Sequence, residues 1–139
     1  MLGDVISETK GKVTGKRVLE VSAIGAPRIE ISQSGKGKIR GSIEITELWT
    51  YWAEHRSDGA HYGEGVGVFM SKDGSNEVVS IRGQGIGRMT ESGGIRYVGS
   101  NFYSTIAKGK LAFLNNLVGV FEYDVEEDGS YTGKTWEWK

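Results

Sequence analysis

The amino-acid sequence predicts an all-β protein that folds as a closed antiparallel barrel of eight strands, with one short crossover helix or turn. Glycine occurs 22 times and proline once, where average usage gives about ten and about seven. Turn residues recur in pairs along the chain, and the segments between them alternate with a period of two. In two segments glycine occupies every second position, at 63, 65 and 67 and at 83, 85 and 87.

The turn signals set the order of the elements. Residues that tolerate positive φ, typical of hairpin turns, occur at Asp58-Gly59, Asp73-Gly74, Gly93-Gly94 and Asp128-Gly129. The segments predicted as strands are residues 13–22, 28–33, 38–52, 61–70, 77–89, 95–105, 118–126 and 131–138. Residues 107–117 carry leucines at 111, 114 and 117 on one side, which predicts the short crossover.

The glycine-rich faces are expected to point into the barrel. Segment 77–89 has a polar face and a second face made of Val79, Ile81, Gly83, Gly85, Gly87 and Met89. Segment 38–52 has a comparable face made of Ile39, Gly41, Ile43, Ile45, Glu47, Trp49 and Tyr51. Glycine weakens a strand by about 0.5–1 kcal/mol, but in a small barrel it relieves crowding where strands bend. Large residues opposite are expected to fill the space, namely Trp49, Tyr51, Phe69 and Trp136.

The sequence does not determine which face of segment 61–70 points into the barrel, because both faces are suited to burial. Gly63, Gly65 and Gly67 form one face, and the other carries Val66, Val68 and Met70. If the valine face points outward, it marks a subunit interface. A homodimer or homotrimer is therefore expected.

Length and charge exclude several classes of protein. A chain of 139 residues is expected to form a single domain over residues 1–139. The absence of cysteine rules out disulfides and thiolate chemistry, and the first residues lack the apolar run of a signal peptide, so we expect a cytoplasmic protein with no membrane partner. A net charge of −1 argues against nucleic-acid binding.

Three motifs that could indicate a functional site are better interpreted as structural features. Gly83-Gln-Gly-Ile-Gly87 is GxGxG within a strand pattern, with no helix after it to bind a phosphate. His55 and His61 match no metal-ligand spacing and are expected in a solvated loop. No serine lies in a GxSxG elbow. We therefore expect neither a cofactor nor a metal.

A carboxylate between aromatic residues is the strongest candidate for a site. Glu47 alternates inward with Trp49 and Tyr51, and a buried, unpaired carboxyl group has a raised pKa and can act as an acid, a base or a ligand anchor. The candidate ligand-binding residues are Glu47, Trp49, Tyr51, Tyr97, Asn101, Phe121, Tyr123 and Trp136. The alternatives are a Glu47 that lies at the barrel rim or pairs with an arginine, and tryptophans that only pack.

The strand order resembles a known group of barrels. The segments GEGVGVF and IRGQGIGRM and the ending KGKLAFLNNLVGVFEYDVEEDGSYTGKTWEWK are similar to small uncharacterised bacterial and archaeal proteins related in fold to allene oxide cyclase. The resemblance covers roughly residues 12–139 and implies a closed barrel with a crossover before the last two strands, often as dimers or trimers. Plant allene oxide cyclases rearrange a fatty-acid epoxide with a glutamate and a cysteine among the cavity residues, and this chain has no cysteine.

Three function classes remain. A binder of a small apolar or amphipathic molecule needs only a cavity with aromatic lining, and it is the first hypothesis. A cofactor-free isomerase or cyclase needs an acid or base in that cavity, for which Glu47 is the candidate catalytic residue. A structural, oligomer-forming barrel instead fills its interior, with Trp49, Phe121 and Trp136 meeting at the axis.

Overall fold

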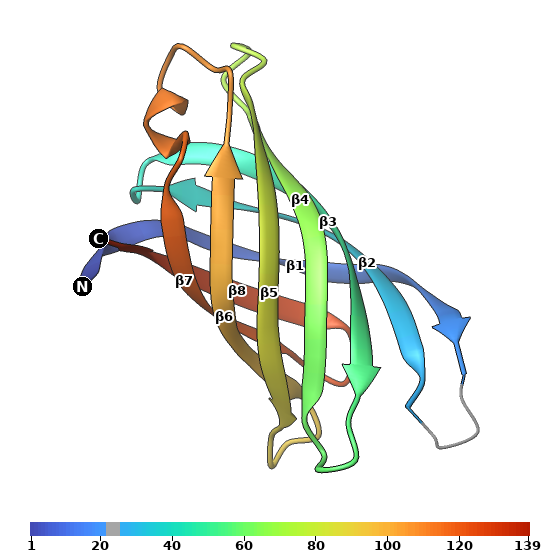
Figure 1. Ribbon diagram of the computed structural model, residues 1–139. Helices are drawn as coiled ribbons and strands as arrows, with labels where there is room; N and C mark the ends of the chain where they lie inside the picture. The colour runs from blue at the N-terminus through green and yellow to red at the C-terminus, as the bar shows by residue number, and fades with distance from the viewer. Residues whose placement is uncertain (22–25) are drawn as a thin grey trace.

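The protein is a closed barrel of eight antiparallel strands, seen in a computed structural model that describes residues 1–21 and 26–139 (Figure 1). The strands are β1 (Leu2–Glu20), β2 (Arg28–Ile39), β3 (Ile43–His55), β4 (His61–Ser71), β5 (Val78–Met89), β6 (Ile95–Ser104), β7 (Val118–Val125) and β8 (Ser130–Trp138). Each strand pairs with the next, and β1 pairs with β8 to close the barrel. The two chain ends therefore meet, and the Lys139 amide donates to the Met1 carbonyl at 2.9 Å. The predicted all-β fold class is confirmed.

The predicted hairpin turns are present in the structure. Gly59, Gly74, Gly93 and Gly129 have φ between 85° and 90°, a left-handed conformation that glycine adopts without a steric penalty. At three of these turns an aspartate side chain accepts a hydrogen bond from the amide two residues on. For example, Asp58 Oδ1 accepts from the Ala60 amide at 2.9 Å. Such local bonds are the reason that aspartate-glycine pairs favour turns.

The predicted boundaries of the first three strands are wrong, and β2 continues past the predicted end at residue 33 to Ile39. β1 begins at Leu2, not at residue 13, and the predicted end of this strand at residue 22 lies outside the described residues. The predicted strand 38–52 is two strands, because a turn at Arg40 (φ 50°) and Gly41 (φ 75°) separates β2 from β3. Gly41 is therefore an exposed turn residue and not an interior one. The alternation continues through this turn without an aspartate or asparagine to mark it.

The interior glycines lie directly opposite aromatic residues of the neighbouring strand. The cross-strand partners include Trp49 with Gly67, Tyr51 with Gly65, Tyr97 with Gly87, Phe121 with Gly99 and Tyr123 with Gly133. A Cβ at Gly67 would stand 2.3 Å from the Trp49 indole, and one at Gly87 would stand 2.7 Å from the Tyr97 ring. The glycines thus leave the space in which the rings lie.

The predicted inward faces of segments 38–52 and 77–89 are otherwise correct, with one exception. Val79 and Ile81 are buried, and Gly83 and Gly85 follow them along the inside of β5. Met89, predicted to continue this face, is 69% exposed because it ends the strand beyond the interior. The GxGxG motif is thus part of a strand that faces the barrel interior.

One end of the barrel is closed by an apolar core. Its buried residues are Ile6, Ile39, Ile45, Phe69, Val79, Ile81, Tyr103, Leu111 and Leu114. Leu111 and Leu114 come from the crossover between β6 and β7, where the predicted helix shortens to the 3-10 turn η1 (Ala112–Leu114) over this end (Figure 1). The Glu77 carboxylate accepts the Leu111 amide at 2.9 Å and so fixes the crossover to the start of β5.

The valine face of β4 points away from the interior. Val66 is 49% exposed, and it alternates with Gly65 and Gly67, which face the aromatic rings. The homodimer or homotrimer expected from Val66, Val68 and Met70 stays a prediction. Within residues 1–21 and 26–139, no helix has the length and apolar character needed to cross a membrane.

Candidate functional site

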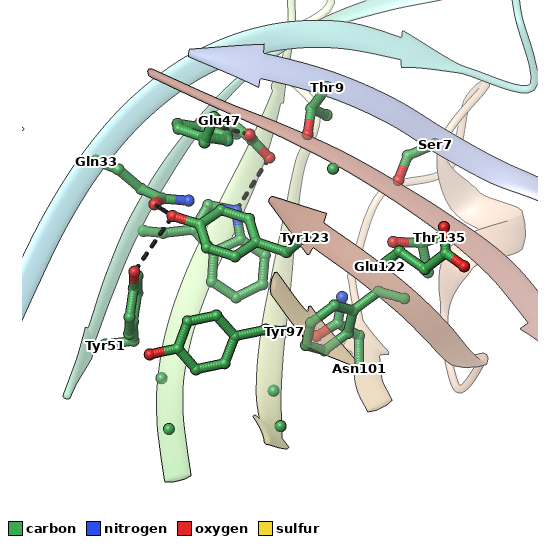
Figure 2. A pocket seen from close by; sticks show the side chains of 18 of the residues that line it. Ser7, Thr9, Gln33, Glu47, Tyr51, Tyr97, Asn101, Glu122, Tyr123 and Thr135 are labelled. Atoms are coloured by element: carbon green, nitrogen blue, oxygen red, sulfur yellow. Dashed lines mark hydrogen bonds between the residues drawn. The ribbon is translucent and has the colours of Figure 1, made fainter. Parts of the chain in front are cut away.

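A cavity of about 100 Å³ lies inside the barrel, next to the apolar core. All eight strands contribute to its lining, including Thr9 from β1, Gln33 from β2, Glu47 from β3 and Tyr131 from β8. Figure 2 shows side chains from several strands that converge on this space. Every candidate site residue predicted from the sequence lines the cavity except Trp136.

The position predicted for Trp136 is wrong. Thr135 is 6% exposed and lines the cavity, so its neighbours Lys134 and Trp136 direct their side chains to the other face of β8. There the Lys134 ammonium lies 5.3 Å from the centre of the Trp136 ring. The inward residues of β8 are Tyr131, Gly133 and Thr135. As a set they are less apolar than the tryptophans Trp136 and Trp138.

Glu47 is the buried carboxyl group of the cavity. It is 3% exposed, and its oxygens accept hydrogen bonds from the Tyr131 hydroxyl at 2.6 Å and from the Trp49 indole at 3.0 Å. Burial raises the pKa of Glu47, and hydrogen bonds from Tyr131, Trp49 and Thr9 oppose this rise in part. Glu47 is therefore not a rim residue.

An arginine partner for Glu47 is also not found in the described part of the chain. The ion pairs within residues 1–21 and 26–139 all involve other carboxylates. The three groups that donate hydrogen bonds to Glu47 are neutral. Burial therefore determines the upward direction of the pKa shift of Glu47, because hydrogen bonds from neutral groups oppose it only in part.

A chain of hydroxyl groups lies beside the carboxyl group. The Tyr123 hydroxyl donates to Gln33 Oε1 and is 3.2 Å from the Tyr51 hydroxyl, which therefore acts as the donor in that pair (Figure 2). The rings of Tyr51, Tyr97 and Tyr123 contact one another, with centroids 5.8–6.1 Å apart. Burial raises the pKa of all three hydroxyls, so they stay neutral near pH 7.

Several cavity residues were missed by the sequence interpretation. They are Ser7, Thr9, Gln33, Tyr131 and Thr135. Ser7 and Thr9 belong to the part of β1 that was not predicted. Tyr131 had a usable signal, because it begins an alternating set with Gly133 in its middle, and inward glycines mark the cavity face on the other strands.

The prediction that both histidines lie in a solvated loop is wrong for His61, which is buried, whereas His55 is exposed at the end of β3. His61 is 7% exposed and its ring stacks on His55 with the centroids 4.1 Å apart. Burial lowers the pKa of His61, and the neighbouring His55 adds to this effect. In the described residues, no group of three or more His, Cys, Asp or Glu side chains is arranged to hold a metal ion.

Comparisons with known proteins support the fold. No protein-family model and no curated protein sequence matches the chain. A solved structure of a protein with unknown function from Clostridium acetobutylicum ATCC 824 superposes with a TM-score of 0.80 at 15% identity, over 98% of each chain. A conserved protein of unknown function from Rhodopseudomonas palustris gives a TM-score of 0.78 at 12% identity, over 99% of this chain and 97% of that one. Both are similar to this protein in fold.

Proposed function

We propose that the protein binds a small apolar or amphipathic molecule in the barrel interior, with Glu47 as the polar anchor. The observation that carries this proposal is a buried carboxyl group that opens onto a cavity lined by aromatic rings. Apolar walls with a few convergent polar groups are the usual composition of a ligand pocket. Buried polar side chains such as Gln33 and Asn101 add hydrogen-bonding groups.

The cavity volume limits the size of the ligand. About 100 Å³ is below the ~300–1,000 Å³ of pockets for drug-sized molecules, but well above the ~10–15 Å³ that one water needs. A single ring or a short branched chain therefore fits better than a long acyl chain. The resemblance to allene oxide cyclase supports an interior ligand, while this volume argues against a fatty-acid substrate.

The filled-barrel alternative is less well supported. It requires Trp49, Phe121 and Trp136 to meet at the barrel axis, but Trp136 lies on the outer face. It also requires an interior without free volume, whereas the lining of this cavity includes glycines from β4, β5 and β8. A chain selected only for packing would gain stability by filling that space.

Binding can be measured through the Trp49 indole, which donates to Glu47. In ¹⁵N-labelled protein, Trp49→Phe identifies the Trp49 indole resonance by its loss. We expect benzyl alcohol, p-cresol or cyclohexanol to shift that resonance in a saturable way, and to leave the indole resonance of Trp138, which is 52% exposed, unchanged. If none of these molecules shifts it at millimolar concentration, the binding proposal fails.

A cofactor-free isomerase is the second candidate, favoured by the pairing of Glu47 with Tyr131. Burial raises the pKa of Glu47 toward the range in which a carboxyl group works as a general base. The Tyr131 hydroxyl, which donates its single proton to Glu47 Oε2 at 2.6 Å, would turn that proton to a carbonyl oxygen of a bound molecule and so free Glu47 to act as the base. Together they suit the removal of a proton from carbon beside a carbonyl group.

This second candidate has a direct test without a known substrate. In D₂O, Glu47 would remove a proton from the methylene group next to the carbonyl of cyclopentanone, exchange it for a deuteron of the solvent, and return that deuteron to the same carbon. We expect the exchange rate to fall by about 10²–10⁴ in Glu47→Gln, with no change in Glu44→Gln on the exposed face of the same strand. Exchange no faster than in buffer would exclude this activity for simple ketones.

A further inference from the structure

We propose that the ligand of this cavity is a small organic cation, such as an alkylated ammonium, held between the Glu47 carboxylate and the faces of the surrounding aromatic rings. This inference rests on the proposed binding function and names its ligand class. It follows from the charged residues and the aromatic side chains that line the cavity.

Aromatic side chains surround much of the cavity. Tyr51, Tyr97, Phe121, Tyr123, Tyr131 and Trp49 line the same space. The face of an aromatic ring carries negative potential and attracts cations, most strongly where water is excluded. A quaternary ammonium needs no hydrogen bond from its host, which suits the aromatic part of this lining.

The charged side chains of the lining differ in the direction in which they point. Lys134 lines the cavity, but its ammonium lies over Trp136 and 3.8 Å from Glu8 on the outer face. Glu122 pairs with Arg96 at 2.9 Å, and Glu64 accepts from Tyr62 on the outside of β4. Among the charged lining residues in the described part of the chain, Glu47 is thus the one with its charge directed inward.

The polar character of Glu47 also disfavours other ligands. Its oxygens accept from Tyr131, Trp49 and Thr9, which fixes the carboxyl group at the cavity wall, and a positive charge beside it would offset the burial that raises its pKa. An anionic ligand would bring a second negative charge into the same buried space, where like charges repel strongly. A neutral ligand would fill the volume without compensating the carboxylate.

Three molecules of nearly equal shape test this directly: choline, the neutral 3,3-dimethyl-1-butanol and the anionic 3,3-dimethylbutanoate. The readout is the Trp49 indole resonance. We expect choline to bind at least about tenfold more tightly than the neutral alcohol, and the anion to bind most weakly. Glu47→Gln should remove at least about tenfold of the choline affinity and leave that of the alcohol nearly unchanged. Glu44→Gln is the matched control.

The pH dependence in the wild type gives a second measurement that needs no variant. The charge of Glu47 acts on the hydroxyls of Tyr131 from β8 and Tyr103 from β6, and burial raises the pKa of each, that of Tyr103 to about 12. Burial also raises the pKa of Tyr51, which lines the same cavity from β3. They stay neutral between about pH 5 and 8. Choline affinity should therefore rise as Glu47 loses its proton, while binding of the alcohol stays level.

The possible outcomes separate the two proposals. If the alcohol binds as tightly as choline, the proposed cationic ligand is wrong and the proposed interior binding stands. The same conclusion follows if the choline affinity depends neither on Glu47 nor on pH. If benzyl alcohol binds but none of the three isosteres does, the cation is again overturned. If no probe of either set binds, the proposed function fails together with this inference.

Discussion

The two parts of the barrel interior follow different rules. Toward η1, apolar side chains such as Ile39, Ile45 and Leu114 are fully buried and fill the interior. Toward the cavity, the buried residues include Glu47, Gln33 and Asn101, and glycines take the place of larger side chains. One part therefore has the composition of a core, and the other has the composition of a site.

This difference separates the part that stabilises the fold from the proposed binding site. Burial of apolar surface stabilises the closed end by about 25 cal/mol per Å², whereas a buried carboxyl group costs free energy unless its hydrogen bonds compensate. The cavity wall also contains glycines, which lower the intrinsic stability of a strand relative to alanine but leave space for the side chains opposite. Substitutions in the two parts should consequently change the free energy of unfolding by different amounts and with a different dependence on pH.

The largest effect is expected at the closed end. Leu114→Ala removes a side chain with 0% exposure from the core, and such substitutions cost about 2–5 kcal/mol in the free energy of unfolding because a cavity remains. Leu48→Ala, at a position that is 51% exposed, should cost less than about 0.5 kcal/mol. Urea denaturation measures both, and equal losses would contradict the placement of η1 over the core.

A smaller loss is expected where a glycine borders the cavity. A Cβ at Gly85 would stand 2.8 Å from the Val98 carbonyl oxygen and 3.1 Å from the Phe121 ring, so Gly85→Val should destabilise by about 1–3 kcal/mol through overpacking. Gln84→Val, on the exposed face of the same strand, is the control and should change stability much less. If Gln84→Val destabilises more than Gly85→Val, the cavity can accommodate the added side chain without overpacking.

Local patterns were sufficient to predict most of the fold. Aspartate-glycine turns and alternation placed the hairpins, and the glycine faces predicted the inward residues Glu47, Trp49 and Tyr51. These features succeed because turn chemistry and period-two burial act over a few neighbouring residues. The turn at Arg40 and Gly41 lacks that chemistry, so it was not recognised.

The missed part of the site has a different physical cause. Sequence interpretation assumes that the more apolar face of a strand points inward, and a polar cavity reverses this rule. Ser7 and Thr9 point inward from β1, while on β8 Trp136 is outside and Thr135 is inside. Only closure of the barrel, which sets the register between β1 and β8, determines that choice.

The pH dependence of stability sharpens the comparison further. Burial raises the pKa of Glu47 above its ordinary value of 4.5, so the folded state holds this proton more tightly than the unfolded state. The resulting stabilisation is complete below pH 4.5 and is lost as the pH rises through the folded-state pKa. The free energy of unfolding of the wild type, minus that of Glu47→Gln, should therefore fall over this range.

This pH experiment has an internal control. The other carboxyl groups titrate in both proteins, so their contributions cancel in the difference. Glu44→Gln, exposed on β3, should give a difference that is nearly flat with pH. A flat difference for Glu47→Gln as well would show that the carboxyl group is solvated in solution.

The smallest effect is expected from the hydroxyl chain at the far side of the cavity from the core. Tyr51→Phe removes the hydroxyl 3.2 Å from that of Tyr123 but keeps the ring in contact with Tyr97. One neutral hydrogen bond contributes about 0.5–1.5 kcal/mol, so the free energy of unfolding should fall by no more than that. Tyr62→Phe removes a hydroxyl on the outer face of β4 and should cost less. A loss for Tyr51→Phe as large as that for Leu114→Ala would mean that the tyrosines, like the leucines of the crossover, hold the barrel together, and the separation between a stabilising end and a binding end would fail.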